Sequence, residues 1–293
     1  VMHACGHDAH AACLLGAAKI LSENRDAFSG KVRLVFQPGE EIGKGAKPFV
    51  AAGVLDGAER VFGLHTAYDL EAGTVGLKPG INNAAVDHFR IRVHGKSTHV
   101  STPHLGVDAL YIASQIVVAV QGLVTRRTSP TEPVIIGIGK LNAGTTYNAV
   151  AAFAEMEGTT RTISQESRDR VRAQVSETAQ SIAALYGGTA EVEWTDFAAA
   201  LINDPQVCRE AAEVVDELLG EGHVVTDREL SLSGDNFAEF ELYKPGAYAY
   251  LGTGNPDLPH TMITNHNGGF DVDENALVTG AGLYVGYTVA RLG

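Results

Sequence analysis

The chain has 293 residues, of which 45% are hydrophobic and 19% are charged, and its formal net charge is −13. This composition is typical of a soluble globular protein with one large domain or two smaller ones, and its acidic balance argues against nucleic acid as a partner. The sequence has no run of about 18 apolar residues and no secretory leader, and its three cysteines are sparse and odd in number; we therefore expect no membrane span and a cytoplasmic protein with reduced thiols.

The first part of the chain alternates between helical and extended patterns. The expected elements are a helix over 9–24, a buried strand over 31–37, a short helix over 46–55, a buried strand over 60–66 and an extended piece over 73–80. Asp8 is placed to cap the first helix, and Pro38-Gly39 stops the first strand. Alternation of this kind favours a mostly parallel sheet with helices on its faces.

The pattern changes near residue 85. Residues 86–95 alternate, with Phe89, Ile91 and Val93 on one face, which predicts a half-exposed strand. The elements that follow are a helix over 108–125, strands over 133–144 and 151–162, a helix over 164–187 with Ser164 as cap and Gly187 as stop, and a strand over 189–197. The order β-α-β-β-α-β predicts a small α+β domain, inserted at 85–195.

The last part returns to the first pattern, with a helix over 204–220, a buried strand over 246–254 and a closing helix over 273–293. The predicted fold class is therefore α/β: a helix-flanked, mostly parallel sheet interrupted by the inserted α+β domain. The main domain is discontinuous and comprises residues 1–84 and 196–293.

Six residues that could bind a metal or transfer a proton lie at four places that follow strands or precede helices. They are Cys5 and His7 in "HACGHD", Glu40 and Glu41 in "QPGEE", His65 in "GLHT" and His266 in "NHNGGFDVDE". In open α/β sheets, ligands gather beyond the carboxyl ends of the strands, and all four places fit this rule. Thiolate, imidazole and carboxylate together suit zinc, manganese or cobalt.

Each of these residues alone has a structural explanation that is more common. His65 would be a hydrogen-bonded core histidine, Cys5 a small buried side chain, His266 a surface loop residue, and Glu40-Glu41 a solvated turn. Their joint occurrence favours one shared metal site. In a glutamate pair, one carboxylate can bind a metal while its neighbour stays free as a general base, which is the equipment for hydrolysing an amide.

Longer motifs carry a resemblance to a known family. They are "MHACGHDAHAACLLGAAKIL", "VFQPGEEIGKGAKPFVAAGVL", "GLHTAYDLEAGTVGLKPG", "GKSTHVSTPHLGVDAL", "AGTTYNAVAAFAEMEGTTRT", "SGDNF" and "HNGGFDVDENAL". With these motifs the chain resembles, over essentially its whole length, the N-acyl-amino-acid amidohydrolases. That family includes hippurate hydrolases and auxin-conjugate hydrolases and lies within the aminoacylase and carboxypeptidase G superfamily.

The resemblance implies an enzyme with two divalent metal ions that cleaves N-acyl amino acids. Cys5 would bridge the ions, His7 and His65 would complete one coordination shell, and Glu41 and His266 would complete the other. Glu40 would be the general base that activates a water between the ions and later protonates the leaving amine.

Three further residues in the inserted domain match positions of this family. His99 would stabilise the oxyanion in the site of a partner, so the resemblance implies a homodimer through the inserted, lid-like domain. Asn148 and Arg161 would hold the substrate carboxylate, which the planar guanidinium of arginine meets with two hydrogen bonds. Without the resemblance, His99 is an exposed turn histidine, Asn148 a turn residue and Arg161 half of a surface ion pair. Asp8 either orients His7 or caps the helix.

The family also carries an upstream segment that has no match in this chain. We therefore expect a fragment with unpaired sheet edges and uncovered apolar surface. Three alternatives to the amidohydrolase remain open: a metallo-dipeptidase or carboxypeptidase with the same site, a thiol hydrolase that uses Cys5, and an inert remnant.

Overall fold

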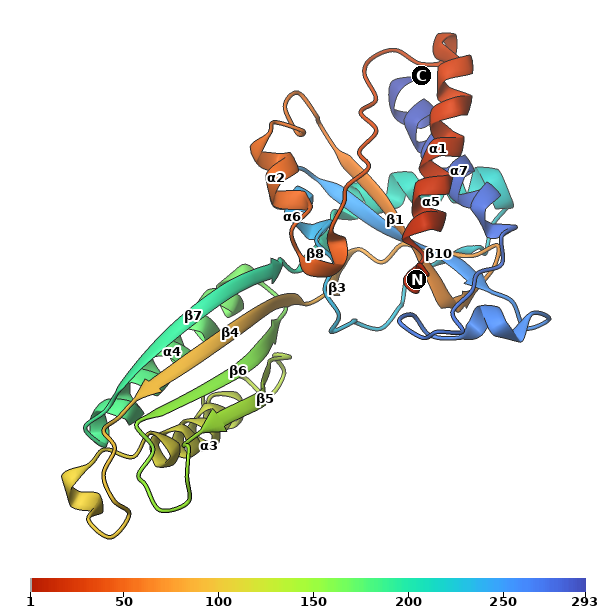
Figure 1. The fold of residues 1–293 in the computed structure, drawn as a ribbon. Coiled ribbons are helices and arrows are strands. Elements are labelled where there is room, and N and C mark those ends of the chain that lie inside the picture. Colours follow the sequence, from red (N-terminus) through yellow and green to blue (C-terminus); the bar gives the residue numbers. More distant parts are fainter. Residues whose placement is uncertain (1) are drawn as a thin grey trace. The chain divides into compact units, whose positions relative to one another are not determined.

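The computed structural model describes residues 2–293, which divide into two compact units (Figure 1). The larger unit contains the chain up to Asn82 together with Leu201–Leu230 and Phe237–Gly293. The smaller unit contains Asn83–Ala200 and the short stretch Ser231–Asn236. Each unit has its own buried core, and each is described by itself below.

The larger unit is built on a four-stranded sheet with the strand order β1-β10-β2-β9. These strands are β1 (Val61–Glu71), β10 (Gly246–Gly254), β2 (Val75–Gly76) and β9 (Val224–Val225). The pairs β1–β10 and β2–β9 are parallel, whereas β10–β2 is antiparallel. The α/β fold class is therefore confirmed, with a mixed sheet. The strands β3 (Gly80–Asn83) and β8 (Leu201–Asn203) form a separate pair.

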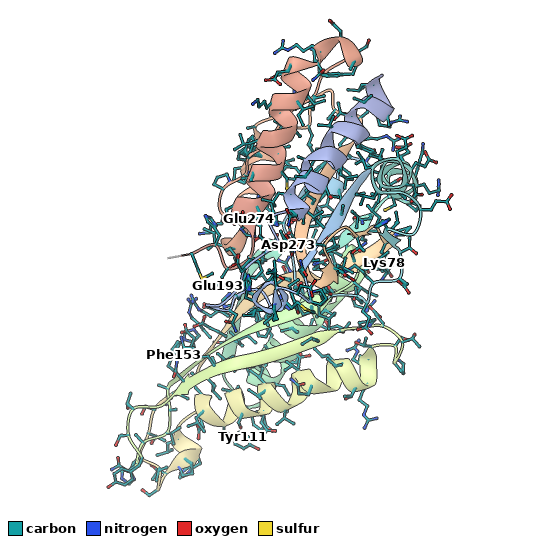
Figure 2. The ribbon with its side chains drawn as sticks, turned by 90° about the vertical axis from the view of Figure 1, so that its right-hand side faces the viewer. Lys78, Tyr111, Phe153, Glu193, Asp273 and Glu274 are labelled. Atoms are coloured by element: carbon teal, nitrogen blue, oxygen red, sulfur yellow. The ribbon has the colours of Figure 1, made fainter. Side chains whose placement is uncertain are left out.

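Three long helices cover this sheet: α1 (His7–Glu23), α5 (Pro205–Leu219) and α7 (Ala276–Leu292). Helices α1 and α7 lie side by side in Figure 1, and Figure 2 shows them from another side with their side chains. Their packing is close because α7 carries Gly280, where an added Cβ would lie 2.6 Å from the Cys13 sulfur. The prediction that Asp8 caps α1 is wrong: the N-cap is Gly6, at φ 78°, and Asp8 lies in the first turn. A carboxylate in the first turn still interacts favourably with the helix dipole.

The remaining helices of the larger unit are short. They are α2 (Ala46–Ala51), α6 (Ala238–Glu241) and the 3₁₀ turns η1 (Arg25–Ala27), η2 (Glu40–Ile42) and η4 (Pro259–Met262). The turn η2 places the two neighbouring glutamates immediately before α2.

The predicted buried strand over 31–37 is wrong. This stretch forms neither a strand nor a helix, and Val32, Leu34 and Phe36 are exposed, with Phe36 at 45%. The alternation of Val32, Leu34 and Phe36 is the pattern of a strand, but a strand is stable only when a neighbour accepts its backbone hydrogen bonds. The pattern therefore predicts a buried strand where the structure has neither a strand nor burial.

The smaller unit has the predicted order β-α-β-β-α-β. Its elements are β4 (Ala85–His94), α3 (Ala109–Arg127), β5 (Ile135–Ala143), β6 (Phe153–Thr162), α4 (Gln165–Leu185) and β7 (Thr189–Ala198), with the 3₁₀ turn η3 (Pro103–Leu105) before α3. All strand pairs in the sheet order β5-β6-β4-β7 are antiparallel. Ser164 caps α4 as predicted, since its hydroxyl accepts a hydrogen bond from the Ser167 N–H at 3.1 Å.

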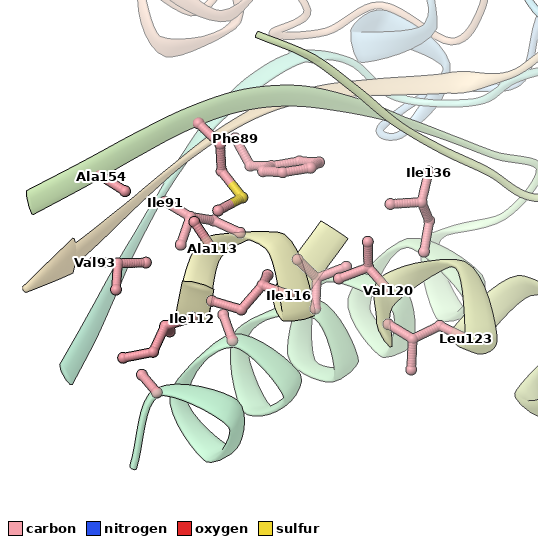
Figure 3. Close-up of a cluster of buried hydrophobic side chains, with 14 of the residues drawn as sticks. Phe89, Ile91, Val93, Ile112, Ala113, Ile116, Val120, Leu123, Ile136 and Ala154 are labelled. Carbon is pink, nitrogen blue, oxygen red and sulfur yellow. The ribbon is translucent and has the colours of Figure 1, made fainter. Parts of the chain in front are cut away.

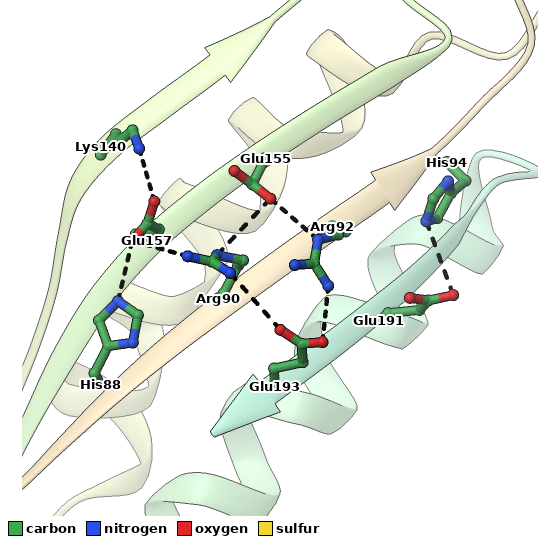
Figure 4. Close-up of polar contacts among 9 residues, drawn as sticks. All are labelled: His88, Arg90, Arg92, His94, Lys140, Glu155, Glu157, Glu191 and Glu193. Atoms are coloured by element: carbon green, nitrogen blue, oxygen red, sulfur yellow. Dashed lines mark hydrogen bonds and ion pairs between the residues drawn. The ribbon is translucent and has the colours of Figure 1, made fainter. Parts of the chain in front are cut away.

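The two faces of this antiparallel sheet differ in chemistry. Phe89, Ile91 and Val93 are fully buried against α3 and α4, where they form the core shown in Figure 3. The alternate residues point to the other face, where basic and acidic side chains pair across the strands (Figure 4). This is the alternation predicted for a sheet with one buried face.

Helix α3 is long and apolar enough to cross a membrane by length and composition alone. Its residues Ile112, Ile116 and Val120 are completely buried in the core of the smaller unit. A core helix of a globular domain passes the same test of length and composition.

A buried ion pair joins this sheet to α4. Asp87 is 1% exposed and accepts two hydrogen bonds from the guanidinium of Arg168, at 2.8 Å from Nε and 2.6 Å from the terminal nitrogen. The geometry is bidentate, so both oxygens of the buried carboxylate are satisfied.

Candidate metal centre

The larger unit brings together all six residues that the sequence proposes for metal binding and proton transfer. Their ligand atoms form three overlapping groups, within each of which all atoms lie within 4.8 Å of one another. The groups are Cys5, His7 and His65; Cys5, Glu41 and His266; and His7, Glu40 and Glu41. Cys5 therefore belongs to two groups that otherwise share no residue.

His65 is held in the tautomer that suits metal binding. Its Nδ1 lies 2.7 Å from the Thr66 carbonyl oxygen, so Nδ1 carries the proton that it donates there. The lone pair of Nε2 is then free to bind, and Nε2 lies 3.6 Å from the Cys5 sulfur. Metal-binding histidines usually donate their second ring N–H in this way, which fixes the ring.

His266 reaches the site from a loop with an unusual backbone. Its φ is 61°, in the left-handed region that is uncommon for residues other than glycine, and its N–H donates to the Ala4 carbonyl at 2.6 Å. This hydrogen bond ties the loop to the Cys5 segment, and it leaves His266 Nε2 3.3 Å from Glu41 Oε1. Backbone strain of this kind persists where the surroundings impose it and is frequent at functional sites.

Asp273 joins the two ends of the loop that carries His266. The Asp273 N–H donates to Thr253 at 3.0 Å, and Asn255 donates to its carboxylate at 2.7 Å. The hydrogen bond from the Asn255 side chain, followed by that from the Asn275 N–H, lowers the pKa of Asp273, which stays ionised and keeps both ends together.

The two glutamates differ in their surroundings. The side chain of Glu40 is 20% exposed and its Oε2 lies 3.6 Å from His7 Nε2, whereas Glu41 is half-exposed and lies within 4 Å of both His7 and His266. Glu41 belongs to two of the three groups and Glu40 to one. Glu41 is thus placed between two imidazoles, and Glu40 lies at one end of the cluster.

The donor set fits two divalent ions that share a ligand. A sulfur common to two three-residue groups is the arrangement expected of a bridging thiolate, and each group adds an imidazole nitrogen with a second nitrogen or a carboxylate oxygen. Such mixed sulfur, nitrogen and oxygen donors suit zinc, manganese or cobalt better than magnesium or calcium.

Two polar contacts of the site were not predicted from the sequence. Asn265 Nδ2 donates to the Cys5 sulfur at 3.3 Å, and His10 Nε2 accepts the Thr66 N–H at 2.9 Å. Burial, followed by the neighbouring charges of His65 and His7, holds the pKa of His10 well below its usual value. The spacing of three residues between His7 and His10 on a helix is a signal that could have placed both rings on one face.

The other three predicted residues, His99, Asn148 and Arg161, belong to the smaller unit. His99 is bridged to the Asn148 segment, because Val100 N–H donates to the Asn148 carbonyl at 3.0 Å. His99 Nδ1 accepts the Ser101 N–H at 3.2 Å, so the neutral ring carries its proton on Nε2, where it can be donated. The side chains of His99 and Asn148 are exposed.

Arg161 lies on β6, in register with Val86 and Ile135 on the neighbouring strands. Burial lowers the pKa of this guanidinium, and the nearby Asp87 partly offsets that effect. Within residues 2–293, its side chain has no ion pair or hydrogen-bond partner. A partly buried arginine of this kind is suited to bind an anionic group.

Comparison with known proteins decides the family. The model of peptidase family M20/M25/M40 matches residues 1–289. The chain belongs to this family. Its members are metal-dependent hydrolases of amide or peptide bonds, and the hydrolase and metal-binding predictions are confirmed at this level.

Individual relatives within the M20 family have related descriptions. An N-acetyl-L-cysteine deacetylase of Bacillus subtilis is 39% identical over 95% of this chain and 65% of its own length. Thermostable carboxypeptidase 1 of Saccharolobus solfataricus is 38% identical over 96% of this chain and 71% of its own length. The crystal structure of a Bacillus subtilis protein described as a dinuclear metal-binding peptidase of the M20 family is 34% identical, with a TM-score of 0.82, over 99% of this chain and 73% of that one. The chain thus spans about two thirds to three quarters of the length of these relatives.

The cysteines of this M20 chain should differ sharply in reactivity. Cys13 and Cys208 are 1% and 2% exposed, and burial raises their thiol pKa values to about 11 and about 12. At about pH 8 both are protonated and shielded, whereas Cys5 is partly exposed, so iodoacetamide should label one thiol per folded chain and all three after unfolding.

Prior addition of zinc should slow this labelling, because a metal-bound sulfur is blocked. The labelled residue is identified by peptide mass mapping. Equal labelling of Cys13 and Cys5 in the folded chain would contradict the burial described here.

Proposed function

We propose that this M20 chain is a two-metal amidohydrolase that cleaves the amide bond of N-acyl amino acids. The observation that carries the proposal is the position of Cys5, shared between the group with His7 and His65 and the group with Glu41 and His266. The two ions would be zinc, manganese or cobalt. The B. subtilis relative described as an N-acetyl-L-cysteine deacetylase supports this substrate class.

The bound ions would polarise the scissile carbonyl and lower the pKa of water at the site. Glu40 is then the group that moves protons: its carboxylate takes a proton from the attacking water and delivers it to the nitrogen of the leaving amine. Glu40 suits this role because it lies 3.6 Å from His7 at one end of the cluster, while Glu41 lies between His7 and His266.

The residues of the smaller unit would recognise the substrate. Arg161, which has no side-chain partner within residues 2–293, would bind the carboxylate of the amino acid, with the Asn148 amide beside it. The Nε2–H of His99 would donate to the oxygen that becomes negative in the transition state. We propose that His99 acts in the site of a second copy, so that the enzyme is a homodimer through the smaller unit. Within the described residues its three cysteines form no disulfide, which is consistent with a cytoplasmic location.

A second candidate is a carboxypeptidase with the same centre. It is favoured by the relative described as a thermostable carboxypeptidase, which is 38% identical. The two candidates differ only in the acyl group, which is a simple acid in one case and a peptide in the other. Both need the same metals and the same proton-transferring glutamate.

A substrate panel tests the proposal and separates the candidates. The metal-loaded chain is assayed with N-acetylcysteine, N-benzoylglycine, a blocked dipeptide and the carboxamide of each. We expect the first two to be hydrolysed, their carboxamides to react at least about tenfold more slowly because the charge that pairs with Arg161 is gone, and a chelator to abolish turnover. Preference for the dipeptide would favour the carboxypeptidase.

The thiol hydrolase gives the opposite pattern in the same assay. Activity that survives the chelator but is lost on alkylation of Cys5 would contradict the two-metal proposal. Metal content of the purified chain, measured by elemental analysis, should reach about two ions per chain in the presence of excess zinc.

A further inference from the structure

The third histidine of the opening motif, His10, has no part in the proposed reaction. It follows His7 on α1 by three residues, and its ring centre lies 4.4 Å from that of His65 and 5.3 Å from that of His7. Its Nε2 lies 2.9 Å from the Thr66 nitrogen and 3.4 Å from the Thr66 hydroxyl. The ring therefore contacts the middle of β1 beside His65, a residue that the sequence pattern predicts at the end of its strand.

The Thr66 N–H is the donor of the peptide group that joins His65 to Thr66. Strand β1 lies at the edge of its four-stranded sheet, and within the described residues its strand neighbour is β10 alone. In an inner strand, such an N–H is paired with a carbonyl of the next strand. Here the acceptor is His10 Nε2, which must be unprotonated to accept, so the neutral ring carries its proton on Nδ1.

Thr66 also connects the two ligand-bearing segments. Its carbonyl accepts the hydrogen bond from His65 Nδ1 at 2.7 Å, and its hydroxyl donates to the Cys5 carbonyl at 3.5 Å. The contact is close, because a Cβ added to Gly6 would lie 2.3 Å from the Thr66 hydroxyl oxygen. A shift of the Thr66 backbone would therefore move the His65 ring and the Cys5 loop relative to each other.

We propose that His10 is a positioning residue of the metal centre. Its Nε2 holds the His65–Thr66 peptide group where an inner strand would have a backbone neighbour, and so keeps His65 Nε2 directed at the Cys5 sulfur. The inference rests on the proposed two-metal function and adds to it a residue that binds no ion itself. Groups that orient ligands in this way commonly change metal affinity about 10- to 100-fold when they are removed.

Two substitutions separate hydrogen bonding from ring packing. His10→Gln retains an acceptor at the place of Nε2 and removes the ring, whereas His10→Phe retains a ring and removes the acceptor. We expect His10→Phe to bind zinc about 10- to 100-fold more weakly in competition with a chromogenic chelator, and His10→Gln to retain the wild-type affinity. In the cobalt-loaded proteins, the visible bands report coordination geometry, so they should change in His10→Phe and stay unchanged in His10→Gln.

The matched controls are His88→Gln and His88→Phe, at a histidine of the smaller unit that pairs with Glu157. We expect both control variants to bind metal as the wild type does. Wild-type affinity and bands in His10→Phe would overturn the inference, and so would a Gln variant as weak as the Phe variant. If His10→Phe does not fold, His10→Gln decides alone: with an unchanged circular dichroism spectrum, a tenfold loss of affinity overturns the inference. A wild-type chain that takes up no metal would instead overturn the proposed function, and this inference with it.

Discussion

Glu40→Gln is expected to leave both metal ions bound and to lower kcat by about 10²- to 10⁴-fold, the usual contribution of a general base. The amide of glutamine has nearly the shape of the carboxylate but cannot take a proton at neutral pH. KM should change little, since Glu40 is proposed to act on the water and the leaving nitrogen rather than on the substrate carboxylate.

The neighbouring substitution Glu41→Gln is the matched comparison. Glu41 Oε1 lies 3.3 Å from His266 Nε2, in the group that also contains Cys5, so its replacement should lower the metal content by about one ion per chain. Elemental analysis and turnover are measured on both variants. Loss of an ion from Glu40→Gln, with full metal content in Glu41→Gln, would reverse the two roles and favour the group of His7, Glu40 and Glu41 as a metal site.

Arg168→Leu is expected to lower the free energy of unfolding of the smaller unit by about 3–5 kcal/mol. Arg168 and Asp87 are at most 5% exposed, so the substitution removes both hydrogen bonds of a buried carboxylate and leaves it only the more distant guanidinium of Arg172, at 3.9 Å. The chain has a single tryptophan, Trp194, which packs against Phe89 in this unit. Its fluorescence during urea denaturation therefore reports the unfolding of the smaller unit.

Two comparisons isolate the cause of this loss. Arg170→Leu removes a partly exposed arginine of the same helix, which pairs with Glu132, and should cost less than about 1 kcal/mol. The double variant Asp87→Leu with Arg168→Leu removes both charges and should recover most of the stability, because apolar residues of similar size replace buried ion pairs well. A double variant as unstable as Arg168→Leu alone would attribute the loss to packing.

The smaller unit could be predicted from the sequence because its signals are local. The alternation of Phe89, Ile91 and Val93 and the Ser164 cap need only neighbours in the chain to have meaning. The strand predicted over 31–37 shows the limit of the same reasoning. An alternating pattern states which side chains should be buried, but burial requires a partner that no local pattern describes.

In the candidate site, too, the residue types could be predicted from the sequence, whereas contacts that depend on the tertiary fold could not. Cys5, His7, Glu40, Glu41, His65 and His266 were proposed from their residue types and positions, and the structure brings their ligand atoms within 4.8 Å in overlapping groups. The division of roles between Glu40 and Glu41 came from the family resemblance. The contacts of His10 and Asn265 depend on a backbone N–H and a sulfur that are distant in the chain. Hydrogen bonds of that kind follow from the tertiary fold; the spacing of His7 and His10 in the sequence indicates only that their rings share a helix face, not what His10 binds. The strained φ of His266 is equally invisible there.

The stretch over 30–36, which forms no helix or strand, is also expected to be open to limited proteolysis. Within the described residues, its backbone makes no hydrogen bond to another segment, and most of its side chains are exposed, which are the conditions under which a protease can bind a peptide in its cleft. This stretch is the covalent link between the helix that follows Cys5 and His7 and the turn that carries Glu40 and Glu41. After a cut here, the fragment that contains α1 would be held by noncovalent contacts, among them the packing of α1 on α7, the contacts of His10 with Thr66 and the hydrogen bond from the His266 N–H to the Ala4 carbonyl. The bound ions would then have ligands on two separate polypeptides, Cys5 and His7 on one and Glu41, His65 and His266 on the other. Release of the metal and dissociation of the fragments would become coupled.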